Sequence, residues 1–429
     1  MLAEFALRRA RPWRAVAERY DEGLPSRKTS RMPAELTVRT VASLGEIAPE
    51  AWDACANPPG LIAAGGVGER FNPFVAHAFL RALEQSGSVG GRSGWTPAHV
   101  VVEDARGRLV AAAPTYIKTH SQGEYVFDHA WADAYQRAGG QYYPKLQIAA
   151  PFTPATGRRL LVGADAPTGA AQALVAGWRA LREAAKASSI HVTFCDKSDA
   201  ETLQRAGFVL RTGEQFHFVN EGYRDFDEFL ASLASRKRKA IKRERRDALG
   251  DGFEVDLLTG GDIKPEHWDA FFAFYMDTGS RKWGRPYLTR AFFDRIGATF
   301  ADRVLLVMAR QGRRYVAGAI NFLGDDALYG RNWGAIVERP FLHFEVCYYQ
   351  AIEFAIRRGF GRVEAGAQGE HKLSRGYRPV ATYSAHEFAD VRMQRAIADY
   401  LARERPAVAE AIEEYAERLP FRRDATESE

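Results

Sequence analysis

The pattern of apolar and polar residues is clearest in the last third of the chain, where it predicts a meander of strands. RVLLVMARQ (303–311) is almost continuously apolar, as buried strands are. After the turn residues QGRR, YVAGAINFLG (315–324) predicts a second strand, and after GDD, ALYGRNWGA (327–335) predicts a third.

A helix and two further strands are predicted to follow this meander. FEVCYYQAIEFAIRRG (344–359) places apolar side chains on one side of a helix, and Gly359 after two arginines is a typical helix end. RVEAGA (362–367) and GYRPVATYSAHEF (376–388) predict the last two strands. Hairpins followed by a strand, helix and strand are typical of a mixed α/β layer.

The same succession occurs earlier in the chain. Five matches keep their order although their spacing drifts: Trp52-Asp53-Ala54 with Trp268-Asp269-Ala270, PFVAHAFLRAL from Pro73 with PYLTRAFFDRI from Pro286, VAAAP from Val110 with VAGAI from Val316, HVTFCD and RAGFV (205–209) with RVEAGA and SRGYRPV (374–380), and QFHFV from Gln215 with AHEFA from Ala385. Ordered matches of this kind predict two copies of one fold.

The repeat predicts how the chain divides. Residues 1–35 form a basic leader that we expect to be loosely ordered, and residues 36–221 form the first copy. Residues 222–250 form a basic connecting helix, and residues 251–429 form the second copy with one or two closing helices at its end.

Composition and charge exclude several classes of protein. The chain has 429 residues, of which 46% are hydrophobic and 26% charged, so it has ample material for a folded core. It contains no apolar run of the ~18 residues that indicates a membrane span, and its first residues lack the apolar stretch of a secretory signal. Cys55, Cys195 and Cys347 fit neither a disulfide framework nor a zinc site. We therefore predict a reducing, cytoplasmic location.

Four longer segments carry a resemblance to a known family. NPFVAHAFLRALEQSGSVGGRSGWTP, GEYVFDHAWADAYQRAGGQYYPKLQ, LHFEVCYYQAIEFAIRRG and GAQGEHKLSRGYRP resemble the FemAB-like, peptidoglycan biosynthesis/recognition family, a tandem-domain branch of the GNAT acyltransferase superfamily. The resemblance covers roughly residues 36 to 390. It implies two tandem GNAT-like domains, each a mixed, mostly antiparallel sheet flanked by helices, and acyl or aminoacyl transfer to an amine.

The segment GAQGEHKLSRGYRP (366–379) supplies the candidate catalytic residues. Acyl transfer needs groups that accept a proton, stabilise an oxyanion and donate a proton to the leaving group. These roles fit the side chains of Glu370, His371, Lys372 and Tyr377, with Gln368 and Arg375 as substrate-binding residues. The alternative is a solvated helix start whose charged side chains face water.

Aromatic and polar residues in two other segments are candidate substrate-binding residues. One set lies in GEYVFDHAWADAYQRAGGQYYPKLQ and the other in YGRNWG, and the candidates are Asp128, Trp131, Asp133, Tyr135, Arg331 and Trp333. The spacing of the acids and the histidine fits no metal site, so we predict none. The alternative is that these side chains pack one copy against the other.

The expected donor depends on a loop before the central helix. The GNAT resemblance implies a glycine-containing loop for the pyrophosphate of coenzyme A, but IVERPFLHFEV (336–346) contains no glycine and GADAPTGAAQALV (163–175) lacks the pattern. This departure weakens the case for acyl-CoA. Aminoacyl-tRNA, which FemAB-type relatives use, is the alternative donor.

A basic helix could bind such a donor. In SRKRKAIKRERRDALG (235–250), Arg236, Lys239, Arg243 and Arg246 form one stripe at helical spacing. Their mutual repulsion would be offset by a polyanion such as tRNA or by an anionic membrane surface. The alternative is a solvated connector.

Two functions of different classes remain open. One is an N-acyltransferase with a single site in the second copy, working by direct transfer to an amine on a cell-wall precursor, a peptide or a small metabolite. The other is a binding module without chemistry that recognises a cell-wall precursor, RNA or a membrane surface. An open divergence of strands around Asn321 and Arg331, facing residues 368–372, would favour the enzyme, and a side-chain plug there would favour the binding module.

Overall fold

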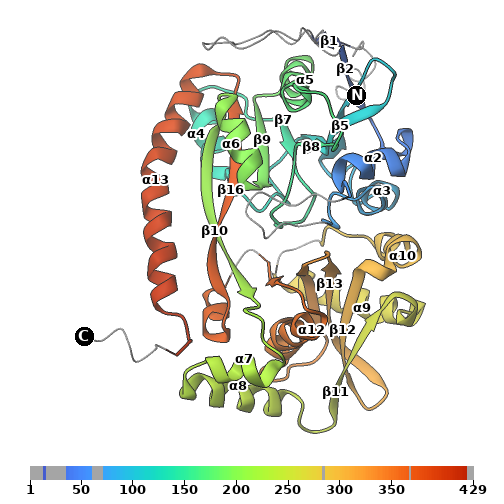
Figure 1. Cartoon of the computed structure of the whole chain (residues 1–429), viewed down its shortest axis with the longest axis vertical. Helices are drawn as coiled ribbons and strands as arrows, with labels where there is room; N and C mark the ends of the chain where they lie inside the picture. Colours follow the sequence, from blue (N-terminus) through green and yellow to red (C-terminus); the bar gives the residue numbers. More distant parts are fainter. Residues whose placement is uncertain (1–12, 16–34, 60–70, 283–285, 367–368, 423–429) are drawn as a thin grey trace, which may run out of the picture.

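The computed structural model describes residues 13–15, 35–59, 71–282, 286–366 and 369–422. The described chain forms two halves, stacked along the long axis of the molecule and joined by one continuous sheet (Figure 1). That sheet has eleven strands in the order β11-β12-β13-β14-β15-β10-β16-β9-β7-β6-β3, and a second sheet has the order β1-β2-β4-β5-β8. Most neighbours are antiparallel, so the predicted α/β class with two GNAT-like halves is confirmed.

The first half contains all the strands of the smaller sheet and one end of the larger one. Its strands are β1 (Trp13–Ala15), β2 (Leu36–Val41), β3 (Trp95–Pro97), β4 (His99–Glu103), β5 (Leu109–Ala113), β6 (Thr115–Lys118), β7 (Lys145–Ile148), β8 (Leu161–Val162), β9 (Ser189–Cys195) and β10 (Val209–Val219). Its helices are η1 (Leu44–Glu46), α2 (Pro49–Ala56), α3 (His77–Gln85), α4 (His129–Arg137), α5 (Ala170–Ala184) and α6 (Lys197–Arg205).

The second half follows two connecting helices. Its strands are β11 (Phe253–Thr259), β12 (Val304–Gln311), β13 (Arg314–Leu323), β14 (Ala327–Ala335), β15 (Arg362–Glu364) and β16 (Arg378–Phe388). The helices from the connector onward are α7 (Phe226–Ser232), α8 (Ser235–Ala248), η2 (Gly260–Asp262), α9 (Pro265–Lys282), α10 (Arg290–Thr299), η3 (Ala301–Arg303), α11 (Leu342–Phe344), the π-helical turn η4 (Glu345–Tyr349), α12 (Gln350–Arg358), η5 (Glu370–Arg375) and α13 (Val391–Glu417).

The predicted strands and helix of the second half are present within a few residues. β12, β13 and β14 form the meander, and β15 follows the helix. The helix ends at Arg358, where Gly359 adopts the left-handed conformation with φ 69° that glycine tolerates best. One difference lies in its first turns, which are π-helical rather than α-helical over Glu345–Tyr349.

The repeat is visible in the strand pairing. In each half, the strand after the central helix pairs in parallel with an earlier strand: β9 with β7, and β15 with β14. The two matched tryptophans occupy equivalent helices, and both are buried, Trp52 in α2 and Trp268 in α9.

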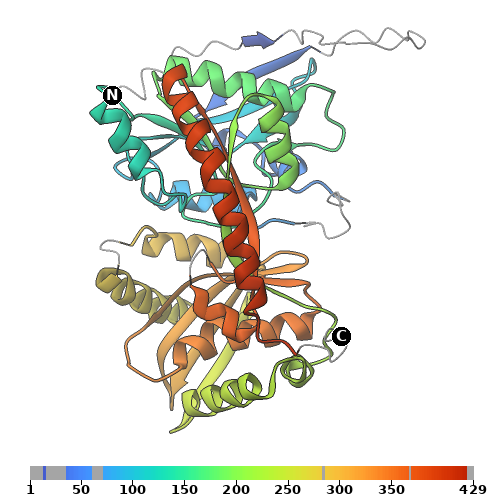
Figure 2. The ribbon, with the colours of Figure 1, turned by 90° about the vertical axis from the view of Figure 1, so that its left-hand side faces the viewer.

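The last strands of the two halves are exchanged. β10, which ends the first half, pairs with β15 of the second half, and β16, which ends the second half, pairs with β9 of the first. β10 and β16 also pair with each other along nine residue pairs from Val209↔His386 to His217↔Arg378. Helix α13 then runs alongside both halves (Figure 2). The halves are therefore interlocked, which the order of the repeats did not predict.

The connector consists of two helices rather than the single predicted one. α7 ends at Ser232, and Leu233, which is extended, and Ala234 separate it from α8. Ala234 donates its backbone N–H to the carbonyl of Pro420, so the end of the chain is fastened to this break.

Side chains of both halves share one core. Phe74 and Phe79 of the first half lie edge-on to Phe322 of β13, with ring centroids 5.3 and 5.4 Å away, and Phe79 also meets Phe292 of α10. Edge-to-face aromatic pairs add roughly 0.5–1.5 kcal/mol each beyond the area they bury. The junction between the halves is thus a packed core, and it fixes how loops of the first half approach β14.

Candidate active site

The site is positioned by a divergence of two parallel strands in the second half. β14 and β15 pair at three positions, Ala327↔Arg362, Leu328↔Val363 and Tyr329↔Glu364. β15 ends at Glu364, whereas β14 continues to Ala335. Beyond Tyr329 the two strands separate at their carboxyl ends, which is where open α/β sheets commonly bind ligands.

A β-bulge lies at the point of divergence. Asn321 of β13 pairs with Gly330, and Ile320 pairs with Asn332, so Arg331 is the extra residue of β14. Bulges next to active sites often redirect a side chain. A Cβ atom added to Gly330 would lie 3.3 Å from the Oδ1 atom of Asn321 and 3.5 Å from the carbonyl oxygen of Glu364, so glycine leaves this position open.

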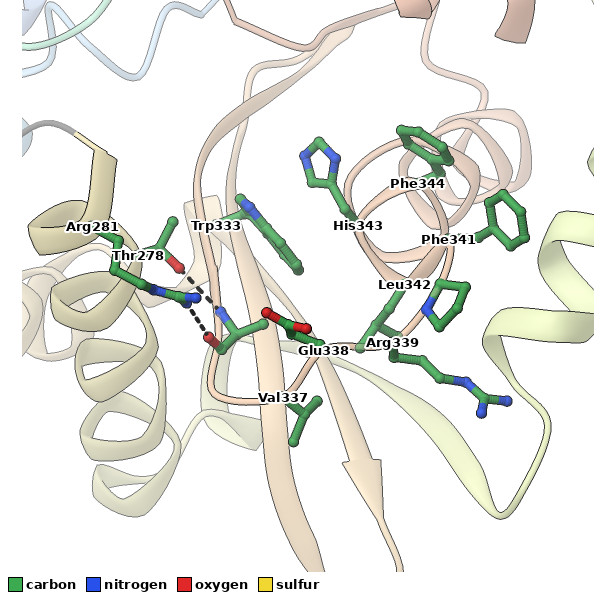
Figure 3. A pocket seen from close by; sticks show the side chains of 12 residues that line it. Thr278, Arg281, Trp333, Val337, Glu338, Arg339, Phe341, Leu342, His343 and Phe344 are labelled. Carbon is green, nitrogen blue, oxygen red and sulfur yellow. Dashed lines mark hydrogen bonds between the residues drawn. The ribbon is translucent and has the colours of Figure 1, made fainter.

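A cavity of about 640 Å³ adjoins the far end of β14 (Figure 3). It is lined by Thr278, Arg281, Trp333, Ala335, Val337, Glu338, Arg339, Pro340, Phe341, Leu342, His343 and Phe344. Arg281 and Thr278 of α9 bond to the backbone of Ala335 and so define one wall, and the ring of Trp333 faces that of His343 at 4.7 Å on the other. This volume is in the range of small-molecule and cofactor sites.

The loop between β14 and α11 closes the cavity without a glycine. Phe341 takes the left-handed conformation, with φ 62°, immediately before α11. Arg339 is fixed to the connector, because it donates to the carbonyl of Asp247 at 2.6 Å and pairs with Asp251 at 2.7 Å. The cavity is therefore linked directly to the end of α8.

Three neighbouring residues predicted to be catalytic lie in η5 but point in different directions. Lys372 is buried, and its Nζ donates to the carbonyl of Gly366 at 2.9 Å. His371 is exposed; its Nε2 lies 2.9 Å from the Tyr348 hydroxyl, and its ring lies near Phe344. Glu370 faces away from both, toward α13, where it accepts a hydrogen bond from Tyr415.

The environment perturbs the pKa of two of these groups. Burial lowers the pKa of Lys372 to about 8; Cys347 opposes this shift and Arg331 adds to it. Burial, with Arg375 and Lys372 nearby, also lowers the pKa of His371. Lys372 thus changes charge close to neutral pH, as acid–base groups in active sites often do.

Tyr377 and Arg375 lie on the inner side of the same segment. Tyr377 is fully buried, burial raises its pKa well above the usual value, and its hydroxyl has no hydrogen-bond partner among the described residues. Arg375 lies over the ring of Phe344 at 3.4 Å and pairs with Glu244 of α8 at 2.9 Å. The Tyr377 hydroxyl consequently keeps its proton, whereas Arg375 is held by structural contacts. Gln368 lies outside the described residues.

On the face of the sheet toward the first half, buried polar groups that the sequence analysis missed surround Arg331. Arg331 donates to the carbonyl of Phe152 in the first half at 2.5 Å, and burial lowers its pKa, with Tyr125 and Glu364 acting in the opposite direction. Glu364 is 4% exposed, and its Oε2 lies 3.8 Å from Nε2 of His217. A lone carboxylate in the apolar strand RVEAGA was the signal that could have identified it.

The predicted binding residues of the first half do not join this cluster. Asp128 is buried and paired with Lys145 at 2.5 Å, and although burial acts to raise its pKa, Lys145 and His191 hold it well below the usual range. Trp131 packs against His386 with ring centroids 5.0 Å apart. Tyr135 packs at the edge of the same cluster, and Asp133 is exposed on α4.

The corresponding divergence in the first half is filled. β7 and β9 pair up to Ile148↔Val192, and Arg159 occupies the space beyond them. Its side chain is 1% exposed and donates to the carbonyls of Thr193, Gly157, Arg158 and Ala155. A buried side chain therefore fills the divergence of the first half.

The basic stripe lies on the exposed side of α8. Arg236, Lys239 and Arg243 are exposed and form no ion pair with any described residue, whereas Arg246 pairs with Asp247 at 3.0 Å. Arg245, on the inner side, pairs with Glu345 at 3.0 Å and Glu353 at 2.8 Å. The sequence thus distributes its basic residues between anchoring the helix and covering its outer face.

The described residues contain no group of three or more His, Cys, Asp or Glu placed to hold a metal ion. Within the same ranges, no helix is both long enough and apolar enough to cross a membrane.

The chain is similar in structure to FemX, with 12% sequence identity, 82% of this chain and 98% of that chain covered, and a TM-score of 0.48. It is also similar to L-PGS from Bacillus licheniformis, with 10% identity, 77% and 99% of the two chains covered, and a TM-score of 0.46. A third similar structure is a tandem GNAT protein from the clavulanic acid biosynthesis pathway, with 12% identity, 83% and 99% of the two chains covered, and a TM-score of 0.41. A comparison with curated protein sequences finds no match.

One family model matches most of the sequence. It covers residues 43–423 and describes FemAB-like proteins of peptidoglycan biosynthesis/recognition. This match supports a transferase of acyl or aminoacyl groups, as the resemblance of the four segments implied. The chain belongs to the FemAB-like family.

Proposed function

We propose that the chain is an N-acyltransferase that moves an acyl or aminoacyl group directly from an activated donor to an amine. The observation that carries the proposal is the divergence of β14 and β15 beyond Tyr329↔Glu364, next to a cavity of about 640 Å³. An open divergence gives a donor and an acceptor access to each other from opposite faces of one sheet. The filled divergence of the first half supports a reaction in the second half alone.

The proposed reaction needs no covalent intermediate on the protein. The amine nitrogen attacks the carbonyl carbon of the donor, the new C–N bond forms, and the bond from that carbon to the leaving oxygen or sulfur breaks. The amine loses one proton, and the leaving group gains one. Lys372, protonated below its pKa of about 8, would stabilise the negative charge of the tetrahedral intermediate. Tyr377, whose buried hydroxyl keeps its proton, is the candidate donor to the leaving group.

The donor we favour is aminoacyl-tRNA, with acyl-CoA as the alternative. The loop before α11 lacks the glycines that bring backbone N–H groups close to a pyrophosphate. Aromatic rings and two arginines, Arg281 and Arg339, line the cavity and suit the base and phosphate of a terminal nucleotide. Both donors carry such a nucleotide, so the cavity alone does not separate them.

The stripe on α8 extends the same proposal to a polyanion. Arg236, Lys239 and Arg243 are exposed on α8, and the end of this helix holds Arg339 of the cavity. A bound tRNA would extend beyond the cavity, and these side chains could contact its phosphates. An anionic membrane surface carrying a lipid-linked acceptor would use the same charges.

The proposal is tested by supplying each donor with a panel of primary amines, including peptidoglycan-precursor peptides. We expect an amide product, detected by mass spectrometry, with one donor class, and loss of product in Lys372→Met. Ligands that co-purify with the protein identify the donor independently. Specific binding of a precursor or RNA without any product from either donor would instead favour the binding module and overturn the proposed transfer.

A further inference from the structure

A buried carboxylate oxygen at the end of β15 has no hydrogen-bond partner among the described residues. Glu364 is 4% exposed, and its Oε1 accepts a bond from Nε of Arg362 at 3.1 Å. Its Oε2 is buried and lacks a hydrogen-bond donor among the described residues. A buried carboxylate oxygen without a donor is costly, so its presence indicates that a donor arrives from outside the described chain.

The strand register shows which face this oxygen occupies. Glu364 is paired with Tyr329 on one side and with His217 on the other, and directly paired residues point to the same face. Tyr329 belongs to the core that the two halves share, and Gln215, two residues before His217, donates to the carbonyl of Pro154 in the first half. Glu364 therefore faces the first half.

The large cavity lies beyond the point of divergence on β14. Asn321 pairs with Gly330, the residue after Tyr329, so its side chain lies on the face opposite to Glu364. Its Nδ2 donates to the carbonyl of Leu305, which belongs to the core beneath α12 and η4. The helix that starts at the large cavity thus covers one face of the divergence, and Glu364 lies on the other.

The charged groups around Glu364 restrict what the donor can be. Arg362 pairs with it, and Arg331 and Lys372 lie close enough to influence the groups of the cluster. His217 is buried, and burial lowers its pKa. The surroundings therefore hold more positive than negative charge. These surroundings disfavour a further cation and favour a neutral N–H donor.

We propose that Glu364, with His217 beside it, is the binding subsite for the primary amine of the acceptor. The amine donates an N–H to Oε2 of Glu364, and the neighbouring positive charges keep the bound amine in its neutral, nucleophilic form. When the nitrogen forms its bond to the donor's carbonyl carbon, it loses one proton, and Oε2 is placed to accept it. This inference rests on the proposed function, because it names the acceptor end of the same site.

The test measures the binding of small amines to the protein in the absence of any acyl or aminoacyl donor. The probe is n-butylamine, and the comparison compounds are butyltrimethylammonium, which keeps the charge but has no N–H, and n-butanol, which has a single O–H donor. Binding is followed by the ring signals of ¹⁵N-labelled histidine in the full chain, with the signal of His217 identified through His217→Gln. Glu364→Gln keeps the size of the side chain but removes its charge. Glu254→Gln is the matched control, because Glu254 lies in the edge strand β11 of the same half and pairs with Arg310.

We expect n-butylamine to shift the His217 signal saturably and more strongly as pH rises, and butyltrimethylammonium to leave it unchanged. Glu364→Gln should weaken n-butylamine binding roughly 10-fold or more, the usual effect of losing a hydrogen bond to a charged group, and Glu254→Gln should not change it. Equal responses to all three compounds, or none, would mean that Oε2 holds only water and would overturn the inference.

The comparison of compounds uses the wild-type chain, so it remains decisive if Glu364→Gln fails to fold. The test also separates this inference from the proposed function. Selective amine binding without transfer from any donor would retain the subsite and reject the enzyme. Transfer at an unchanged rate and unchanged amine KM in Glu364→Gln would retain the enzyme and reject the subsite.

Discussion

The two halves build the same strand divergence and use it in opposite ways. In the first half, the space beyond Ile148↔Val192 holds Arg159, whose guanidinium is satisfied by backbone carbonyls. In the second half, the last residue paired before the divergence, Glu364, keeps a buried oxygen that no described residue bonds. At this one place in the fold, the first copy uses its polar side chain for internal contacts, and the second leaves a polar atom available to a ligand. Duplication allows this division because one copy can preserve the architecture while the other retains a site.

The dependence of each half on the other is tested most directly by separating the two halves. We expect the isolated segment 251–429 to show no cooperative thermal unfolding and no transfer, because β15 and β16 would lose β10, the strand that lies between them. Co-expression of segments 1–250 and 251–429 should restore both properties, since the cut falls in the turn before β11. Circular dichroism and calorimetry provide the measurement. A segment 251–429 that folded alone and transferred at full rate would show that the first half is dispensable.

Within the second half, the largest expected effect of one residue is at Lys372. Lys372→Met should lower turnover by roughly 10² or more, as is usual when a group that stabilises developing charge is lost. The matched control is Lys197→Met, which removes an exposed lysine from α6 of the first half. Unchanged turnover in a well-folded Lys372→Met variant would remove this residue from the reaction.

Replacing the stripe on α8 should alter the salt dependence of binding to tRNA. Substituting Gln for Arg236, Lys239, Arg243 and Arg246 should reduce the magnitude of the log–log slope by about 3, because each phosphate contact contributes about 0.7–0.9. Gln is a good helix former, so α8 should remain intact. The control removes four exposed arginines from the first half: Arg92, Arg106, Arg137 and Arg205. An equal change of slope in both variants would mean that the polyanion does not distinguish the halves. Anionic vesicles, titrated in parallel, identify the membrane alternative.

The pH dependence of transfer should reflect the titration of a group in the second half and not of one in the first half. If protonated Lys372 stabilises the intermediate, kcat should be highest below its pKa of about 8 and fall roughly tenfold per pH unit above it. The buried Lys118 of the first half, whose pKa burial lowers to about 7, should leave no inflection. The measurement is kcat at saturating donor and amine from pH 6 to 9, for the wild type and for Lys372→Arg, which stays charged. A descending limb that persists unchanged in Lys372→Arg would assign it to another group.

The smallest effect on transfer is expected from the plug of the first half. Arg159→Met leaves buried carbonyls without donors and should lower the free energy of unfolding by about 2 kcal/mol or more, while turnover per folded molecule stays the same. Urea denaturation gives the first quantity, and an assay below the onset of unfolding gives the second. A loss of turnover at unchanged stability would mean that the first half also takes part in the chemistry.

The sequence predicted local structure and the repeat better than it predicted the site. Strand and helix positions from residue 303 onward follow from hydrophobic periodicity and turn residues, which act over a few neighbours. The exchange of β10 and β16 depends on partners far apart in sequence, and no local pattern reports it. The roles of Glu370 and Lys372 show the same limit, because two residues in one short segment point to opposite sides. Glu364 was missed because its strand looked like core, and only the cross-strand pairing reveals that one oxygen lacks a partner.

The exchanged strands also bear on how the chain is made. His191 of β9 and its neighbour across the sheet, His386 of β16, are 195 residues apart in sequence. During synthesis, β9 and β10 leave the ribosome long before the strand that lies between them, and domains generally fold as they emerge. The nascent first half therefore waits with two open strand edges until almost the whole chain has been translated. Such edges pair readily with other chains, so newly made molecules should depend on chaperones until the last strand enters the sheet.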